Sequence, residues 1–518
     1  MKSTGHEINR RAIYTIVALL ISLSATTYWL ALVTHAYWAF EDGSLDLTHY
    51  SYNLYFNIHY LHYGGIAGML QFLTFGNHIS PDMLLMLPFF YAYPHSLTLL
   101  YIQTITICLT SFLVFAIARD LIKDDRIAMA MLAAFLLNPG ITGILTFDFH
   151  IEFVLVPAYL LVFYSYMKSR RKLFAVSLLL LLGALEIAPV IALTMGIGLF
   201  SYELLSSRSS GRAISREKRQ MIAIIVLSSI ATGAMYYASI RLLAASYGLQ
   251  YPGIPQFLQI GTGSEVGFIS QLHGAALNPI SFLGSNLAIY SNPLALFMLA
   301  LSMAIVLFGF GLFALKTPSV TFLLSLQWLV PVIAWSGKIK FLYTGYMYYG
   351  YTLGSTIAAS IIGAISYARC KNGSSNMLDR NAIGAISVII IALMLSSASL
   401  ILAYAPLKYL ATYGSASPEP GYNPVQVYQI ARLVPQNASL MTQDVISPHL
   451  GSREYLETTA SWEMGNSTYF VPDYILISHN ASDAYTNISY YDLFQRAVAA
   501  NPYVEYASSG NVVLYKRK

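Results

Sequence analysis

Long apolar runs recur along most of the chain and are separated by short polar segments. A run of about 18 to 25 apolar residues is long enough to cross a bilayer core of roughly 30 Å as a helix. Runs of this kind predict helices at 12–34, 95–118, 127–144, 151–167, 173–186, 187–205, 220–243, 293–315, 318–336, 346–368 and 383–405. The pattern therefore predicts an all-α polytopic membrane protein with about 11 transmembrane helices.

The stretch 173–205 can be divided in two ways. Glu186 and Pro189 interrupt it, which favours two short helices that meet near the outer surface. As a single span it would move every later segment to the opposite side of the membrane. The basic loop after Leu205 favours two spans, because basic loops lie on the cytoplasmic side.

The hydrophobic pattern changes after Pro406. Pro, Gly and Ser mark a linker, and mixed polar and apolar residues follow it. Short apolar strands are expected at 474–478 and 512–515, and helices at 425–433 and 491–500. The sequence thus predicts two domains: a transmembrane domain at 1–406, with a large first outer loop at about 35–94, and a small extracytoplasmic α/β domain at 407–518.

Composition and charge support this division and add an orientation. Of the 518 residues, 56% are hydrophobic and only 10% are charged, against roughly 25% charged in soluble domains, which excludes an ordinary globular protein. No Lys or Arg lies between Arg11 and Arg119, whereas later basic clusters alternate with the spans. Because Lys and Arg in short loops mark the cytoplasmic side, we expect a cytoplasmic N-terminus and a C-terminal domain outside the cell membrane.

The segment LTFDFHIEFVL places Asp148, His150 and Glu152 at alternate positions, at the outer junction of two predicted spans. A carboxylate in hydrocarbon is costly unless it is paired or hydrated, so such acids are functional candidates. In an extended backbone the three side chains would face one cavity, whereas in a helix they would fan apart. The alternative is an interfacial loop that is hydrated at the level of the lipid headgroups.

Three further candidates lie near the predicted outer surface. Glu186 is either a site residue or a helix-end acid that touches headgroups. The Tyr- and His-rich loop around Asp46 suits a sugar ligand, and it equally suits an interfacial helix. His78 is either a ligand or a turn residue, and no tight ligand spacing such as H-x-x-x-H supports a metal site.

Arg241, Lys338 and Lys340 are cations on the predicted outer side, against the general distribution of charge. They would bind a lipid phosphate in a specific site, or headgroups in general. No P-loop and no G-x-G-x-x-G follows a predicted strand, and nothing in the sequence indicates nucleic-acid binding.

The succession NHISPDMLLMLPFFYAYP, FLLNPGITGILTFDFHIEFVLVPAYLLVFY and LLLGALEIAPV resembles the family of predicted membrane proteins known as domain of unknown function 2079. The resemblance covers most of the membrane part and reaches ARLVPQNASLMTQDVISPHLGSRE and PDYILIS in the C-terminal part. That family is grouped with the C-type (GT-C) glycosyltransferases, which are multi-pass enzymes that use lipid-linked sugars outside the cytoplasm. The resemblance therefore implies a GT-C-like fold.

Individual residues match short motifs of this family. His78 matches an H-x-S-P-like element, and an F-D-F-H-x-E element is matched by Asp148, His150 and Glu152. Glu186 matches an acid that the family often places after a lysine, whereas leucine precedes it here.

The first outer loop departs from the family pattern. Asp46 and Leu47 fit the start of an Asp-Leu-Gly element, but Thr48 stands in place of the glycine. An alternative register would place Asn53 at the acid, and a catalytic carboxylate would then be missing.

The resemblance implies transfer of a sugar from a polyprenyl-phosphate donor to an exterior acceptor, with Asp46 as general base. The implied substrate-binding residues are His78, Asp148, His150, Glu152 and Glu186, and those implied to hold the lipid phosphate are Arg241, Lys338 and Lys340. A divalent metal cation is allowed and not required. Two other functions stay open: a transporter or lipid flippase with a buried acidic site, and a non-catalytic membrane scaffold for the exterior domain.

Overall fold

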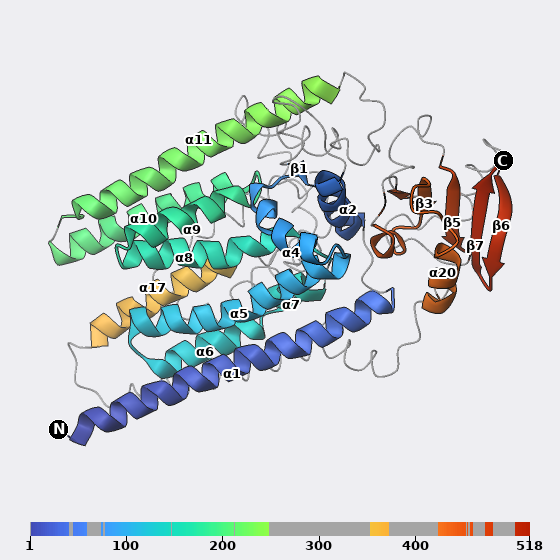
Figure 1. Cartoon of the computed structure of the whole chain (residues 1–518). Helices are drawn as coiled ribbons and strands as arrows, with labels where there is room; N and C mark the ends of the chain where they lie inside the picture. Colours follow the sequence, from blue (N-terminus) through green and yellow to red (C-terminus); the bar gives the residue numbers. More distant parts are fainter. Residues whose placement is uncertain are drawn as a thin grey trace, which may run out of the picture.

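Figure 1 shows the computed structural model, a bundle of long helices with a small sheet beyond one end. The structure describes residues 2–40, 45–59, 74–75, 78–146, 148–211, 213–247, 353–371, 423–451, 453, 456–458, 472–479 and 503–518. The helices are α1 (Lys2–Trp38), α2 (Leu45–His59), α4 (Leu87–Ala92), α5 (Ser96–Ile122), α6 (Asp125–Leu136), α7 (Pro139–Thr146), α8 (Leu155–Met167), α9 (Arg171–Gly183), α10 (Ala188–Ser210), α11 (Arg216–Tyr247), α17 (Leu353–Lys371) and α20 (Pro424–Ala431). The 3-10 helices are η1 (Pro81–Leu85), η2 (Ile151–Val154) and η7 (Ser447–His449). The strands are β1 (Thr74–Phe75), β2 (His78–Ile79), β3 (Leu440–Thr442), β4 (Leu456–Thr458), β5 (Tyr474–Ser478), β6 (Tyr503–Ser509) and β7 (Val512–Arg517).

Several described helices are suited to cross a bilayer. Four are long and apolar enough, namely Arg10–Trp38, Ser96–Ile122, Ala188–Arg208 and Arg216–Ser239, and each overlaps a predicted span. Shorter apolar helices lie at Ile151–Met167 and Gly354–Ile365, within two further predicted spans. The prediction of a multi-pass, mostly helical membrane protein is confirmed. The predicted spans at 293–315, 318–336 and 383–405 lie outside the described residues.

The span predicted as one helix at 127–144 is broken. The axes of α6 and α7 differ by 45° at the junction that contains Asn138 and Pro139. Proline has no backbone N–H and disfavours helical geometry in the residue before it, so the helix ends there. The Asn138 side chain accepts a 2.8 Å hydrogen bond from the backbone N–H of Gly140 and so caps the next helix.

The stretch 173–205 forms two helices, as predicted. α9 ends at Gly183, and α10 begins at Ala188 with Pro189 in its first turn, where a backbone N–H has no helical partner in any case. Glu186 lies in the turn between the two helices.

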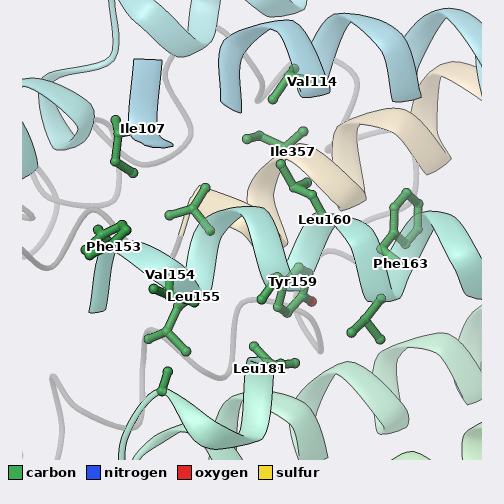
Figure 2. Packing of buried hydrophobic residues seen from close by; sticks show 14 of the residues in the cluster. Ile107, Val114, Phe153, Val154, Leu155, Tyr159, Leu160, Phe163, Leu181 and Ile357 are labelled. Atoms are coloured by element: carbon green, nitrogen blue, oxygen red, sulfur yellow. The ribbon is translucent and has the colours of Figure 1, made fainter. Parts of the chain in front are cut away.

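Helix α8 packs against α5, α9 and α17 (Figure 2). Its buried Leu160 points toward Ile357 of α17, and its buried Tyr159 points to the other side, toward Leu181 of α9. α17 approaches closely because it has a glycine at position 354, where an added Cβ would lie 3.0 Å from the Cβ of Tyr159. Lipid tails are as apolar as leucine, so this packing stabilises the bundle mainly through close van der Waals contact.

The C-terminal part contains a five-stranded mixed sheet in the order β4-β3-β5-β7-β6. β3 runs parallel to β4 and β5, whereas β7 runs antiparallel to β5 and β6. The predicted strands at 474–478 and 512–515 are β5 and the first part of β7, and the predicted helix at 425–433 is α20. The predicted helix at 491–500 lies outside the described residues.

Helix α2 lies between the bundle and the C-terminal unit, by which we mean the described residues from 423 to 518 (Figure 1). Leu47, Tyr50 and Leu54 of α2 belong to the hydrophobic core of the bundle. Tyr52 instead packs into the core of the C-terminal unit. Consecutive residues of a helix differ by about 100° in direction, so these two sets occupy different faces of α2.

Polar and aromatic contacts of η7 join the C-terminal unit to the bundle. The Ser96 hydroxyl donates a 2.7 Å hydrogen bond to the carbonyl of Pro448. The Ser447 hydroxyl shares a hydrogen bond with that of Thr48 on α2. The half-buried His449 ring stacks on Phe40 with a centroid distance of 4.0 Å. α2 is therefore held from both sides.

Candidate functional site

The segment between α7 and η2 is extended before it becomes helical. His150 has φ −141° and ψ 126°, and a 3-10 turn begins at the next residue. The extended backbone that would let alternate side chains share one side therefore ends at His150. Glu152 is the second residue of the 3-10 turn, so its backbone is helical and not extended like that of His150.

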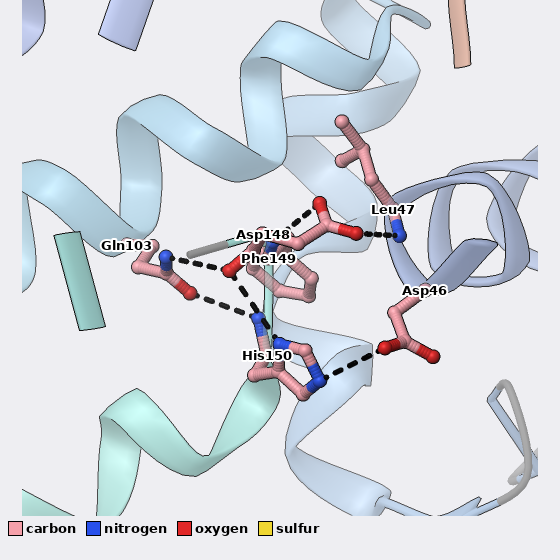
Figure 3. A network of polar contacts seen from close by, with 6 residues as sticks. All are labelled: Asp46, Leu47, Gln103, Asp148, Phe149 and His150. Atoms are coloured by element: carbon pink, nitrogen blue, oxygen red, sulfur yellow. Dashed lines mark hydrogen bonds and ion pairs between the residues drawn. The ribbon is translucent and has the colours of Figure 1, made fainter. Parts of the chain in front are cut away.

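Gln103 of α5 holds this extended segment (Figure 3). Its side-chain amide donates to the carbonyl of Ile144 at 2.9 Å and to that of Asp148 at 3.2 Å. Its side-chain oxygen accepts from the backbone N–H of His150 at 2.9 Å. Gln103 was not predicted as a site residue, and its only signal in the sequence is an amide side chain within an apolar span.

Asp148 connects the extended segment to α2 (Figure 3). One carboxylate oxygen accepts from the backbone N–H of Leu47 and the other from that of Phe149, both at 2.7 Å. Leu47 is in the first turn of α2, whose N–H groups have no helical partner, so the buried carboxylate caps the helix. Both oxygens of Asp148 are thus engaged by the backbone.

The side chains of Asp46 and His150 are in contact next to this cap. The Nε2 atom of His150 lies 3.3 Å from a carboxylate oxygen of Asp46 (Figure 3). The Asp46 side chain is 38% exposed and that of His150 only 6% exposed. The Nδ1 atom of His150 lies 3.5 Å from the carbonyl oxygen of Asp148. An accessible carboxylate is therefore held beside a buried imidazole. The contact places Asp46 beside the F-D-F-H-x-E segment.

The hydroxyl of Tyr50 is a common neighbour of the predicted acids. Burial, followed by the negative charges of Glu152, Asp46, Glu186 and Asp148, raises the pKa of Tyr50. Tyr50 is thus a neutral phenol that can donate and accept hydrogen bonds. The fold brings all four acids, which span 140 positions of the sequence from 46 to 186, within electrostatic range of one hydroxyl.

Several buried polar atoms on α2, η1 and η2 have no hydrogen-bond partner among the described residues. They include the hydroxyl of Tyr50, Nδ2 of Asn53, Oγ of Ser80, Oδ2 of Asp82 and Oε2 of Glu152. Such atoms are rare in folded proteins, because burying a polar group without a partner is unfavourable. A polar ligand that reached them would recover that free energy.

Asp82 of η1 extends this polar region toward α9. It is 7% exposed, and an added Cβ at Gly183 would lie 2.4 Å from its carboxylate. Asp82 and Glu186 both act electrostatically on the Tyr236 hydroxyl, which donates to the carbonyl of Leu182 at 2.8 Å. Burial raises the pKa of Asp82 to about 7. Asp82 was not among the site residues predicted from the sequence.

The raised pKa of Asp82 predicts a pH-dependent stability. Between about pH 4 and pH 7 the folded protein keeps a proton that the unfolded chain has released, so the free energy of unfolding falls as pH rises through this window. Asp82→Asn removes this dependence. We expect the variant to have a higher melting temperature than the wild type at pH 8, and the difference to shrink as pH falls toward 4. Thermal unfolding in detergent at several pH values measures it, and parallel curves for the two proteins would contradict the assignment.

The remaining predicted residues are only partly described. The backbone of His78 pairs with Phe75 across β1 and β2, but its side chain lies outside the described residues, as does that of Arg241 on α11. Lys338 and Lys340 lie outside the described residues altogether. In the part of the chain that the structure describes, no three His, Cys, Asp or Glu side chains are grouped so that they could hold a metal ion.

Comparisons with known proteins give a family and a distant structural similarity. The family described as "Predicted membrane protein (DUF2079)" matches residues 19–514. No curated protein matches the chain. Two solved structures that match are crystal structures of ArnT from Cupriavidus metallidurans. The one bound to undecaprenyl phosphate is 11% identical, with a TM-score of 0.42 over 98% of each chain. The one in the apo state is 12% identical, with a TM-score of 0.43 over 99% of this chain and 98% of ArnT. Scores this low do not by themselves establish a common fold.

Proposed function

The chain belongs to the family of predicted membrane proteins called domain of unknown function 2079, and from that premise and the surroundings of Asp46 we propose that it is a GT-C-like membrane glycosyltransferase. Its donor is a sugar linked to a polyprenyl phosphate, and its acceptor lies on the exterior face. The observation that carries the proposal is the 3.3 Å contact between the accessible Asp46 carboxylate and the buried His150 ring.

Asp46 acts as the general base in this proposal. Its carboxylate takes the proton of the acceptor hydroxyl while the hydroxyl oxygen attacks the anomeric carbon of the donor sugar. The bond between that carbon and the phosphate oxygen breaks, and its electron pair leaves with the phosphate of the lipid carrier. His150 orients the carboxylate through their contact, and Asp148 holds the helix on which Asp46 stands.

The sugar is bound by the polar atoms around Tyr50. Sugar hydroxyls both donate and accept hydrogen bonds, so they suit the buried phenol of Tyr50 and the carboxylate of Glu152. Glu186 and His78 belong to the same proposed binding set. Asp148 contributes indirectly, because both of its oxygens already accept backbone hydrogen bonds. The proposed ligands of the departing phosphate are Arg241, Lys338 and Lys340.

The proposed topology places this site on the outer side of the membrane. In this topology the protein has about 11 spans, a cytoplasmic N-terminus, a transmembrane domain at 1–406 and an extracytoplasmic domain at 407–518. The position of the C-terminal unit supports this topology, because η7 contacts α2, the helix that carries Asp46.

The proposal is tested in cells that lack the protein. We expect their exterior glycans to lose one sugar, and the wild-type gene to restore it. Accumulation of the unused polyprenyl-phosphate sugar in membrane extracts is the second expected result. Unchanged glycans together with an unchanged pool of lipid-linked sugars would remove the catalytic assignment.

Transport is the second candidate function, and the buried Glu152 favours it. Glu152 is 3% exposed and its Oε2 atom has no hydrogen-bond partner among the described residues, as in an acid that takes up and releases a proton in a transporter. Glu152→Gln discriminates the two functions. A transferase should lose roughly tenfold in sugar transfer through a missing substrate contact, whereas a proton-coupled transporter should lose its flux in proteoliposomes entirely. Glu505→Gln, an exposed acid of β6, is the matched control.

A further inference from the structure

Arg453 is a buried cation at the junction between the C-terminal unit and α2. Its side chain follows η7 and is 4% exposed. The guanidinium Nε donates to the carbonyl of Leu450 at 3.3 Å. Its Nη1 atom is buried and has no hydrogen-bond partner among the described residues, and no described carboxylate lies within ion-pair distance. This arginine therefore has a strong donor that no described group uses.

The guanidinium stays charged in this position. Burial lowers the pKa of Arg453 to about 10, and the nearby hydroxyl groups of Tyr52 and Tyr55 oppose that shift. A pKa of about 10 leaves the group protonated at neutral pH. An uncompensated buried charge is strongly unfavourable, so a position of this kind calls for an anion.

The surroundings of Arg453 are separate from the Asp46 site. Tyr52 and Tyr55 are six and nine positions beyond Asp46 on the same helix, which turns their side chains by roughly 240° and 180° away from it. Tyr52 lies in the core of the C-terminal unit, whereas Tyr50 and the partly buried Tyr55 pack in or against the core of the bundle. A ligand that contacts Arg453 and the Tyr55 hydroxyl would thus lie where the two cores meet at α2, on a side of the helix turned away from Asp46.

We propose that Arg453, with the hydroxyl of Tyr55, binds a phosphate group at the junction between the C-terminal unit and α2. A guanidinium presents parallel N–H donors that match two oxygens of a phosphate, and a tyrosine hydroxyl can donate to a third. The phosphate belongs either to the headgroup of a lipid or to a soluble phosphate compound. In both cases it links the C-terminal unit to the helix that carries Asp46, and the binding does not depend on the transferase assignment.

The test measures the melting temperature of the full-length protein in detergent. The probes are inorganic phosphate, a polyprenyl phosphate in mixed micelles, and the uncharged polyprenol as control. Ligands that bind the folded state raise the melting temperature in a saturable way. We expect a rise of a few degrees for the wild type, a loss of that rise for Arg453→Gln, and a retained rise for Arg432→Gln, an exposed arginine of the same unit.

Two milder variants keep the test decisive if Arg453→Gln folds poorly. Arg453→Lys keeps the positive charge but loses the paired N–H donors of the guanidinium, and Tyr55→Phe loses one hydroxyl donor. Each variant should therefore raise the phosphate concentration at half-saturation by roughly tenfold. The proposed donor site would also bind polyprenyl phosphate, so only the part of a shift that Arg453→Gln loses reports on this site. A lost shift with inorganic phosphate identifies a soluble ligand, and a lost shift with polyprenyl phosphate alone identifies a lipid headgroup. Absence of any shift with both probes, or equal shifts in the wild type and all Arg453 and Tyr55 variants, would overturn the proposal.

Discussion

Replacement of Asp46 by asparagine should lower sugar transfer by about 10²- to 10⁴-fold, which is the usual contribution of a general base. Asparagine has the same shape and can still contact the ring of His150, so the geometry around the 3.3 Å contact should persist. It cannot accept a proton at neutral pH. The loss should therefore appear in turnover, with the melting temperature and the binding of carrier lipid unchanged.

The measurement compares membranes that contain the wild type or Asp46→Asn, with transfer from a polyprenyl-phosphate sugar as the readout. Glu505→Gln is the control, because Glu505 is exposed on β6 and bonds only to the hydroxyl of Ser508 among its described hydrogen-bond partners. Transfer by Asp46→Asn within a factor of about three of the control would be too small a loss for a general base. The role of base would then pass to another acid near Tyr50, or the scaffold function would stand.

Asp148→Ala should have the largest effect on stability, lowering the free energy of unfolding by about 2–4 kcal/mol. The carboxylate caps α2 through Leu47 and also binds the amide of Phe149, both at 2.7 Å. Alanine leaves both N–H groups buried without this acceptor. The first turn of α2 should loosen, and Asp46, which lies in that turn, should lose transfer activity as well.

Asp148→Asn provides the graded comparison. Its single side-chain oxygen can accept one of the two hydrogen bonds, so its melting temperature should fall between those of the wild type and Asp148→Ala. Thermal unfolding in detergent and the transfer assay are run on the same preparations. A wild-type melting temperature for Asp148→Ala would mean that the cap contributes nothing, and the link between Asp148 and Asp46 would be refuted.

Most helices and strands that the sequence predicted correctly contain a long apolar run. The spans of α1, α5, α10 and α11 each contain a strongly apolar stretch and the strand β5 is buried throughout, because an apolar run has few alternatives to burial in lipid or in a core. The break between α6 and α7 was missed, although Asn138 and Pro139 were visible. Proline interrupts a membrane helix only where neighbouring groups bond to the backbone N–H and C=O groups that lose their helical partners. A single sequence does not show which neighbours do so.

The acids of the candidate site were proposed from the sequence, but the residues that contact and hold them were not. Local motifs pointed to Asp46, Asp148, His150 and Glu152. The groups that hold or surround them were not predicted: Gln103 lies in the middle of a span, Tyr50 among many tyrosines of the first loop, and Asp82 after a motif that drew attention to His78. None of these has a spacing that marks a function.

The sequence by itself determined that this chain is a multi-pass, mostly helical membrane protein, and it predicted two strands of the C-terminal sheet and acids at the ends of spans. These properties follow from local hydrophobicity and charge, which need no knowledge of distant contacts. The tertiary structure decided which acid is exposed beside His150 and which is consumed in capping α2, since Leu47 and Asp148 are 101 positions apart. It also decided that Arg453 is buried against α2, because only the packing of one unit on another removes a charge from water.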